Sequence, residues 1–218
     1  MTAEKSSKAV TKRLTILEAD EIEAVFGLPI FDDDDRAFYF SLLPPEKALL
    51  SQLHGHKSYI YYILQLGYFK ARQQFFVFDQ EQVAADANYV QRINFPEHTL
   101  RDFEISKGTR LKQQRLIMEL LNYRSCCEEE WSLLRRKAQQ LARISSRPIY
   151  IFRELLAYLT RERIVMPGYT MIQEMIGDVL HREKERLVAI ASSQLTAGDV
   201  VALNNLLDNP HGLYEITR

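Results

Sequence analysis

The spacing of apolar residues predicts a chain built almost entirely of helices. From Ser58 to Phe69 the sequence is apolar on nearly every side, which is typical of a helix surrounded by other helices. Later in the chain, apolar residues recur at steps of three and four in segments that begin near residues 106, 128, 148 and 170. The stretch from Phe75 to Phe78 is a candidate for a short strand or an extended crossing. We therefore predict an all-α fold with little or no sheet.

Polar residues mark where several of these helices begin. Thr15 with Glu18, and Thr196 with Asp199, have the spacing of a capping box, in which two side chains satisfy each other's free backbone amides. Thr170 is placed to cap the helix that follows a Pro-Gly loop. These signals predict three helix starts.

Two other runs predict helix starts of a different kind. The carboxylates of Asp32 to Asp35 precede an aromatic run, so we expect them near the positive N-terminal end of a helix. They are also a candidate Mg²⁺ site, but oxygen ligands must converge on a cation and consecutive side chains diverge. Pro44-Pro45 is expected in a first helical turn, where no amide donor is required. We predict two helix starts and no metal site.

Length and composition indicate globular helical domains. The 218 residues are 46% hydrophobic and 26% charged, and no apolar run approaches the roughly 18 residues of a membrane span. The polar N-terminus has no apolar segment behind its lysines and is not a secretory signal. We expect a disordered basic arm at 1–13, a first helical domain at 14–124 and a second at 125–218, with the boundary between 124 and 146.

Cysteine and histidine usage bears on redox compartment, metals and catalysis. Cys126 and Cys127 are adjacent, which excludes a disulfide framework and is typical of a reducing compartment. With the five histidines they give no zinc-site spacing, so we predict no metal and no other cofactor. An enzyme using either thiol as nucleophile needs a depressed thiol pKa and a nearby histidine base. No nucleophile motif is present, and we predict a non-enzymatic cytoplasmic protein without membrane association.

Charge is segregated along the chain in a way that the total of −1 conceals. Between Trp131 and Arg163 there are eight basic residues and two acidic ones, a local net charge of +6, so the remainder carries −7. A second basic group lies at the start of the helix expected after Ser106. A partner made of phosphates responds to such local fields rather than to the total charge.

Two helical patterns lie on either side of a loop that contains Pro167-Gly168. The first ends near Arg163 and the second contains Ile172 and Met175. Such a pair has the outline of a helix-turn-helix unit, whose second helix enters the major groove of DNA. The seven-residue break is longer than the usual tight turn of that unit.

Three stretches of the chain share an order and spacing with a known family. They read HGHKSYIYYILQLGYFKARQQFF, TRLKQQRLIMELLNYRSC and RPIYIFRELLAYLTRERIVMPGYTMIQEMI. Their matching places are Leu66-Gly67-Tyr68, Thr109-Arg110 with Arg115, Tyr123-Arg124, and Arg163 through Pro167-Gly168. The chain resembles, over residues 14–208, the N-terminal region of transposases of the Tn-three family, the replicative class II transposons.

This resemblance implies a set of helical domains that bind the terminal inverted repeats of a transposon. In that family, cutting and joining belong to an RNase H-like core with an Asp-Asp-Glu metal triad, which lies much later in a far longer protein. The sequence has no counterpart of that core. We therefore expect binding of double-stranded DNA without cleavage, by an excised fragment or truncated product, with the remainder of the transposase as a partner and with nucleoid association in a bacterium when DNA is bound.

On this interpretation the basic groups contact phosphates and fix the register, while polar side chains of an inserted helix read base edges. The later helix contributes two weaker candidates, His181 and Arg182. The full set of expected DNA-binding residues is Lys107, Arg110, Lys112, Arg115, Arg124, Arg135, Arg136, Lys137, Arg143, Arg147, Arg161, Arg163, His181 and Arg182.

The alternative is a helical protein–protein interaction module with no nucleic-acid role. In that case the cationic helical face meets an acidic protein or stays hydrated. Salt distinguishes the two functions, because counterion release makes DNA affinity fall steeply as salt is added.

Overall fold

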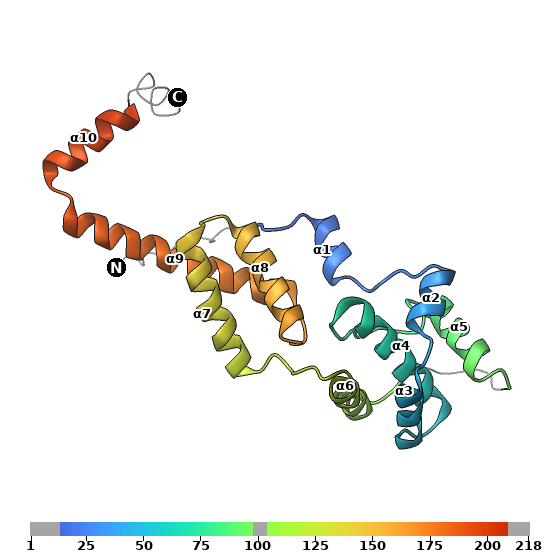
Figure 1. Cartoon of the computed structure of the whole chain (residues 1–218). Coiled ribbons are helices and arrows are strands. Elements are labelled where there is room, and N and C mark those ends of the chain that lie inside the picture. The colour runs from blue at the N-terminus through green and yellow to red at the C-terminus, as the bar shows by residue number, and fades with distance from the viewer. Residues whose placement is uncertain (1–13, 98–103, 209–218) are drawn as a thin grey trace, which may run out of the picture.

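A computed structural model describes residues 14–97 and 104–208, and Figure 1 shows their arrangement. This part of the chain has ten α-helices, one short 3-10 helix and no strand, so the all-α prediction is confirmed. The first elements are α1 (Ala19–Phe26), α2 (Asp33–Tyr39), α3 (Pro44–Ala48), η1 (Leu49–Gln52), α4 (His56–Arg72), α5 (Ala84–Asn94) and α6 (Lys107–Leu121). The later elements are α7 (Glu128–Ile144), α8 (Pro148–Arg161), α9 (Tyr169–Gln194) and α10 (Ala197–Asp208). The predicted arm at 1–13 lies outside the described residues.

Three of the predicted helix starts are confirmed. The Asp32 carboxylate accepts a hydrogen bond from the Asp35 amide at 2.8 Å, which caps α2. Pro44 is the first residue of α3. At α10 the Asp199 amide donates to the Thr196 hydroxyl at 3.3 Å and the Thr196 amide donates to the Asp199 carboxylate at 2.8 Å, which completes the capping box.

Two predicted starts are wrong, each by a small shift in position. Helix α1 is capped by Glu18, whose amide donates to the Glu21 carboxylate at 2.9 Å, and Thr15 precedes it in extended chain. Helix α9 begins at Tyr169 with Gly168 as its N-cap, so Thr170 already lies inside the first turn. The two starts are linked in space, because the Tyr169 hydroxyl at the start of α9 accepts hydrogen bonds from the Ile16 and Leu17 amides just before α1.

Helix α4 is the centre of the first hydrophobic cluster. Every residue from Ile60 to Phe69 is buried, because α2, α5 and α6 pack around this helix. The apolar segment therefore forms the central helix that its sequence predicted. The stretch from Phe75 to Phe78 follows as irregular chain across the cluster, with the Phe78 ring stacked on Tyr61.

A buried polar network fixes α2 and α5 against α4. The Asp86 carboxylate on α5 accepts hydrogen bonds from the Tyr68 hydroxyl at 2.6 Å and from the Arg36 guanidinium at 2.7 Å. Burial, together with the Asp86 carboxylate, raises the pKa of Tyr68, so the phenol keeps the proton that it donates. These buried groups are satisfied by one another, which is the condition for burying them at modest cost.

Helices α7, α8 and α9 form a three-helix bundle around the second hydrophobic cluster. Its fully buried side chains include Leu134 on α7, Leu155 on α8 and Ile176 on α9. The seven residues between α8 and α9 give the longer break that the sequence indicated. The last buried residue of α9 is Val179, and the helix continues beyond the bundle toward α10 (Figure 1).

The N-terminal segment packs on the second cluster although its neighbours in sequence belong to the first. The Leu17 side chain is buried there, and the Phe26 ring contacts the rings of Phe152 and Tyr169. The Leu17 amide donates to the Tyr169 hydroxyl at 3.2 Å. The spatial division into two clusters therefore differs from a single cut in the sequence, and the two-domain boundary stays a prediction.

The two clusters meet where α4, α6 and α8 end. Gln73 and Asn122 cap α4 and α6, and Arg163 follows Glu162, the C-cap of α8; all three are non-glycine residues in the left-handed conformation. The Gln73 carbonyl accepts a hydrogen bond from the Met166 amide at 2.9 Å, and Arg124 pairs with Ile164 in a single parallel β-bridge. We call these segments, 73–74, 121–124 and 160–166, the junction.

No single helix of the described residues is both long and apolar enough to cross a membrane. Helix α9 and residues 197–205 of α10 are together long and apolar enough for a membrane span. The two segments are bent by 117° relative to each other.

We expect Gly67→Ala to destabilise the protein by about 1 to 3 kcal/mol, because the new methyl would overpack the core. A Cβ at Gly67 would lie 2.5 Å from ring carbons of Phe40 and 3.2 Å from the Tyr39 carbonyl oxygen. Urea denaturation measures the change in the free energy of unfolding.

The matched control is Gly177→Ala, within α9, where a Cβ meets no atom within 4 Å. Alanine removes conformational freedom from the unfolded chain, so this variant should be more stable by about 0.5 to 1 kcal/mol. Equal effects of the two substitutions would contradict the close packing of α4 on Phe40.

Candidate nucleic-acid interface

Helix α7 carries cationic side chains on the face opposite its buried residues. Leu134, Ala138 and Leu141 are buried against α8 and α9, while Arg136 and Arg143 are exposed on the opposite side. Arg135 lies half-buried at the edge of this side. None of these three arginines forms an ion pair within the described residues. We call the surface formed by Ser132, Arg135, Arg136, Gln139 and Arg143 the α7 face.

A shallow cleft of about 410 Å³ is lined by the first turns of this face and includes the half-buried Trp131. Glu128 lies at its N-terminal end, so the positive field grows from the start of α7 toward its end. Lys137 was predicted with these cations. It follows Arg136 by about 100° around the helix and lies half-buried on the other flank.

The predicted cations of α8 lie at its two ends. Arg147 is the exposed residue that precedes Pro148 at the start of the helix. Arg161, in the last turn, pairs with Glu162 at 3.0 Å and lies over the Tyr158 ring at 5.4 Å. Arg147 therefore extends the cationic region of α7, whereas the charge of Arg161 is partly neutralised.

Arg124 and Arg163 both hold the junction. The Arg163 guanidinium donates a hydrogen bond to the Leu121 carbonyl at 3.1 Å. The Arg163 backbone carbonyl accepts a hydrogen bond from the Arg124 amide at 2.8 Å. The Arg124 guanidinium pairs with the Glu130 carboxylate at 3.2 Å. Each of these arginines makes intramolecular contacts that account for its position.

A further basic group occupies the start of α6, as the sequence indicated. Ser106 caps the helix through the Thr109 amide at 3.2 Å. Lys107 and Arg115 are exposed, and the Lys112 ammonium donates to the Gln52 carbonyl at 3.3 Å. Cations in a first turn oppose the helix dipole, so a bound anion would relieve their mutual repulsion.

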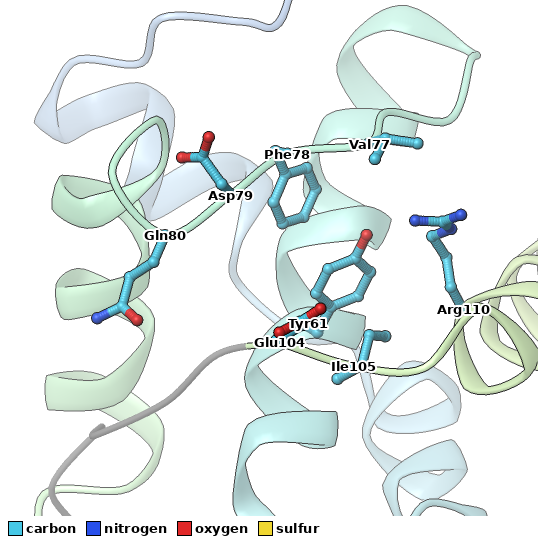
Figure 2. A pocket seen from close by; sticks show the side chains of 8 residues that line it. All are labelled: Tyr61, Val77, Phe78, Asp79, Gln80, Glu104, Ile105 and Arg110. Atoms are coloured by element: carbon cyan, nitrogen blue, oxygen red, sulfur yellow. The ribbon is translucent and has the colours of Figure 1, made fainter.

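Arg110 differs from the rest of this group because it lines a cleft of about 380 Å³. Figure 2 shows its guanidinium at one rim, Asp79 and Gln80 on the opposite side, and the Tyr61 ring between them. Glu104 also lines the cleft. Carboxylates and one cation share this recess, so it is electrostatically mixed rather than cationic.

His181 and Arg182 lie on α9 just past its last buried turn, and both are exposed. His181 Nε2 is 3.3 Å from the Glu185 carboxylate, one turn further along. The predicted cations thus fall into four groups: the start of α6, the junction, the α7 face with Arg147, and the middle of α9. Arg135, Arg136 and Arg143 of the α7 face form no ion pair within the described residues, and Arg143 adds to the effect of Arg186 in lowering the pKa of Glu183 on α9.

Two polar side chains that were not among the predicted DNA-binding residues lie within these groups. Gln139 lies within the cationic α7 face, and its signal was present, since it stands three and four residues from Arg136 and Arg143. Glu130 is buried and pairs with Arg124. No local pattern predicted that pair, because it forms only when the junction folds.

The two thiols differ from an activated nucleophile. Burial, with Glu130 and Cys127 nearby, raises the pKa of Cys126 to about 11, so this thiol is protonated at neutral pH. The Cys127 thiol donates to the Glu130 carboxylate rather than to an imidazole. Within the described residues no three histidine, cysteine, aspartate or glutamate side chains are grouped to hold a metal ion.

We expect Glu130→Gln to lower stability at neutral pH by about 1 kcal/mol, with the loss disappearing in acid. The Cys127 thiol, the backbone amides of the first turn and the Arg124 charge lower the pKa of Glu130. A lowered folded pKa means that the carboxylate stabilises the fold above the ordinary glutamate pKa and that this contribution is lost as pH falls below it. Urea denaturation from pH 7 to pH 3 measures the change.

The control is Glu129→Gln, the exposed neighbour, which should alter stability by less than about 0.5 kcal/mol at each pH. A Glu130→Gln deficit that stayed constant down to pH 3 would refute the assigned ion pair.

Residues 16–179 of the chain match the model of a protein family described as Domain of unknown function (DUF4158). The match begins in the N-terminal segment and ends at Val179, the last buried residue of α9, so it spans both hydrophobic clusters. No curated protein matches the chain. Because the match extends over most of its length, the chain belongs to the DUF4158 family.

Proposed function

We propose that this chain binds double-stranded DNA as the non-catalytic N-terminal part of a transposase of the Tn-three type, with the terminal inverted repeats of the transposon as its target. The α7 face carries the proposal, since its exposed Arg136 and Arg143 form no ion pair within residues 14–97 and 104–208 and are available to phosphates. The DUF4158 family is found in transposase-like proteins, which supports the same function. Cutting and joining belong to a separate catalytic core in this proposal.

The geometry gives the cationic groups different parts in such binding. The α7 face and Arg147 contact the backbone of one DNA segment, because their arginines form no ion pair with the residues that the structure describes. The group at the start of α6 adds phosphate contacts through Lys107 and Arg115. Arg124 and Arg163 act indirectly, by holding the bundle in place through the junction.

The alternative function is a helical protein–protein interaction module without a nucleic-acid role. The observation that favours it is the exposed apolar surface of the distal α9 and α10, where Leu187, Val188 and Val201 are each more than half exposed. An apolar contact surface depends little on salt, whereas phosphate binding depends on it steeply.

Salt titration separates these two functions. If about six cations neutralise phosphates, affinity for a transposon-end duplex should fall on the order of 10³-fold between 50 and 200 mM salt. Fluorescence anisotropy with a labelled duplex measures the dissociation constant at each salt concentration. A flat response would refute DNA binding through the α7 face and favour the interaction module.

Charge reversal locates the contact surface. The double variant Arg135→Glu, Arg136→Glu should weaken binding to transposon-end and scrambled duplexes alike, by roughly tenfold or more, and reduce the salt slope by about 2. The control, Lys47→Glu with Arg92→Glu, makes the same charge change on the exposed surfaces of α3 and α5. Equal losses in both double variants would mean that only net charge matters, and no loss in the first would mean that the contact surface lies elsewhere.

A further inference from the structure

The helix-turn-helix outline assigns groove insertion to α9, and its electrostatics argue against that assignment. From Tyr169 to Leu180 the helix contains no lysine, arginine or histidine. Over this length it exposes the carboxylate of Asp178. Carboxylates held in a groove lie between two rows of phosphates, so like-charge repulsion opposes insertion of this part of α9.

Helix α7 presents the opposite arrangement. Ser132, Arg136, Gln139 and Arg143 follow one another at steps of four, three and four residues, so they form one stripe along the helix. The stripe lies opposite the buried Leu134, Ala138 and Leu141. It is about 17 Å long at the rise of an α-helix, which is the length of about five base-pair steps.

The composition of the stripe is suited to reading bases as well as to holding phosphates. Gln139 is an uncharged amide with an arginine about one turn away on each side. A glutamine side chain pairs with adenine in the major groove, where its amino group donates to N7 and its carbonyl accepts from N6. An α-helix with its side chains is about 10 to 12 Å wide, which fits a major groove about 12 Å wide.

Two exposed acidic residues in the first turn of α7 set the direction of insertion. Glu128 and Glu129 lie in the first turn and are exposed, so they would meet phosphates if the whole helix entered the groove. The part from Ser132 to Arg143 carries the cations, and Arg147 follows it. The C-terminal three turns of α7 are therefore the part that enters, with the acidic first turn outside.

We propose that α7, rather than α9, is the helix that lies in the major groove, and that Gln139 reads an adenine there. This inference rests on the proposed DNA binding and adds to it the reading helix and one specificity-determining residue. Arg136 and Arg143 hold the amide in register from either side along the stripe.

The test uses the full chain and a library of duplexes with a random central segment, from which bound molecules are selected and sequenced. The wild type should select a motif that contains adenine at one position. The variant Gln139→Ala should lose that preference by about 5- to 150-fold, the range expected for one lost bidentate contact. Its affinity for unselected random duplex and its salt slope should stay unchanged, which also shows that the variant is folded.

Two control variants distinguish the reading helices. Gln140→Ala removes an exposed amide next in sequence but about 100° away from the stripe, and it should leave the motif unchanged. Asp178→Asn changes the exposed face of α9 and should also leave the motif unchanged. A motif altered by Asp178→Asn and retained by Gln139→Ala would overturn the inference in favour of α9.

The remaining outcomes separate the two proposals. If the wild type binds random duplex with steep salt dependence but selects no motif, DNA binding stands and the base-reading role of Gln139 is refuted. If the wild type binds no duplex at 50 mM salt, the proposed function itself fails and the inference fails with it.

Discussion

Three backbone turns in an unfavourable conformation determine how the two halves of the molecule sit together. Gln73, Asn122 and Arg163 have φ angles of 57°, 56° and 51°. The left-handed region costs a residue with a side chain roughly 1 to 2 kcal/mol. Here each turn ends one helix and directs the chain into a shared set of hydrogen bonds, such as Arg124 to Arg163 and Met166 to Gln73. The direction in which α7 leaves the first cluster depends on these turns.

The junction also explains why some arginines stabilise the fold whereas others with similar neighbours in sequence stay exposed without an ion pair. Arg124 pairs with Glu130, and Arg163 donates a hydrogen bond to the Leu121 carbonyl, so both side chains stabilise the fold. Arg136 and Arg143 lie on the far side of a helix whose inner face is filled, so no carboxylate of the described residues pairs with them. Counting charges along the sequence does not distinguish arginines that form internal contacts from arginines that stay exposed. The packing of the helices does.

The sequence was sufficient wherever one segment determines its own structure. The apolar run from Ser58 to Phe69 could only be a surrounded helix, and the Thr196 cap depends on residues three apart. Prediction from the sequence failed where a residue's position depends on a partner far away along the chain. Helix α9 begins at Tyr169, whose hydroxyl accepts a hydrogen bond from Leu17, 152 residues earlier, and local spacing cannot indicate such a contact. For the same reason the α7 face followed from periodicity, whereas the burial of Glu130 beside Arg124 did not.

The placement of the N-terminal segment has a consequence for how the molecule is made. The hydrogen bond from the Leu17 amide to the Tyr169 hydroxyl closes a loop with a sequence separation of 152 residues. Closing so long a loop carries an entropic cost that nearby contacts do not share. During synthesis the segment leaves the ribosome before α7, α8 and α9, whose side chains form the cluster that buries Leu17. Residues of this segment therefore find their native partners only after α9 has been made, and until then a nascent chain must keep them from wrong associations.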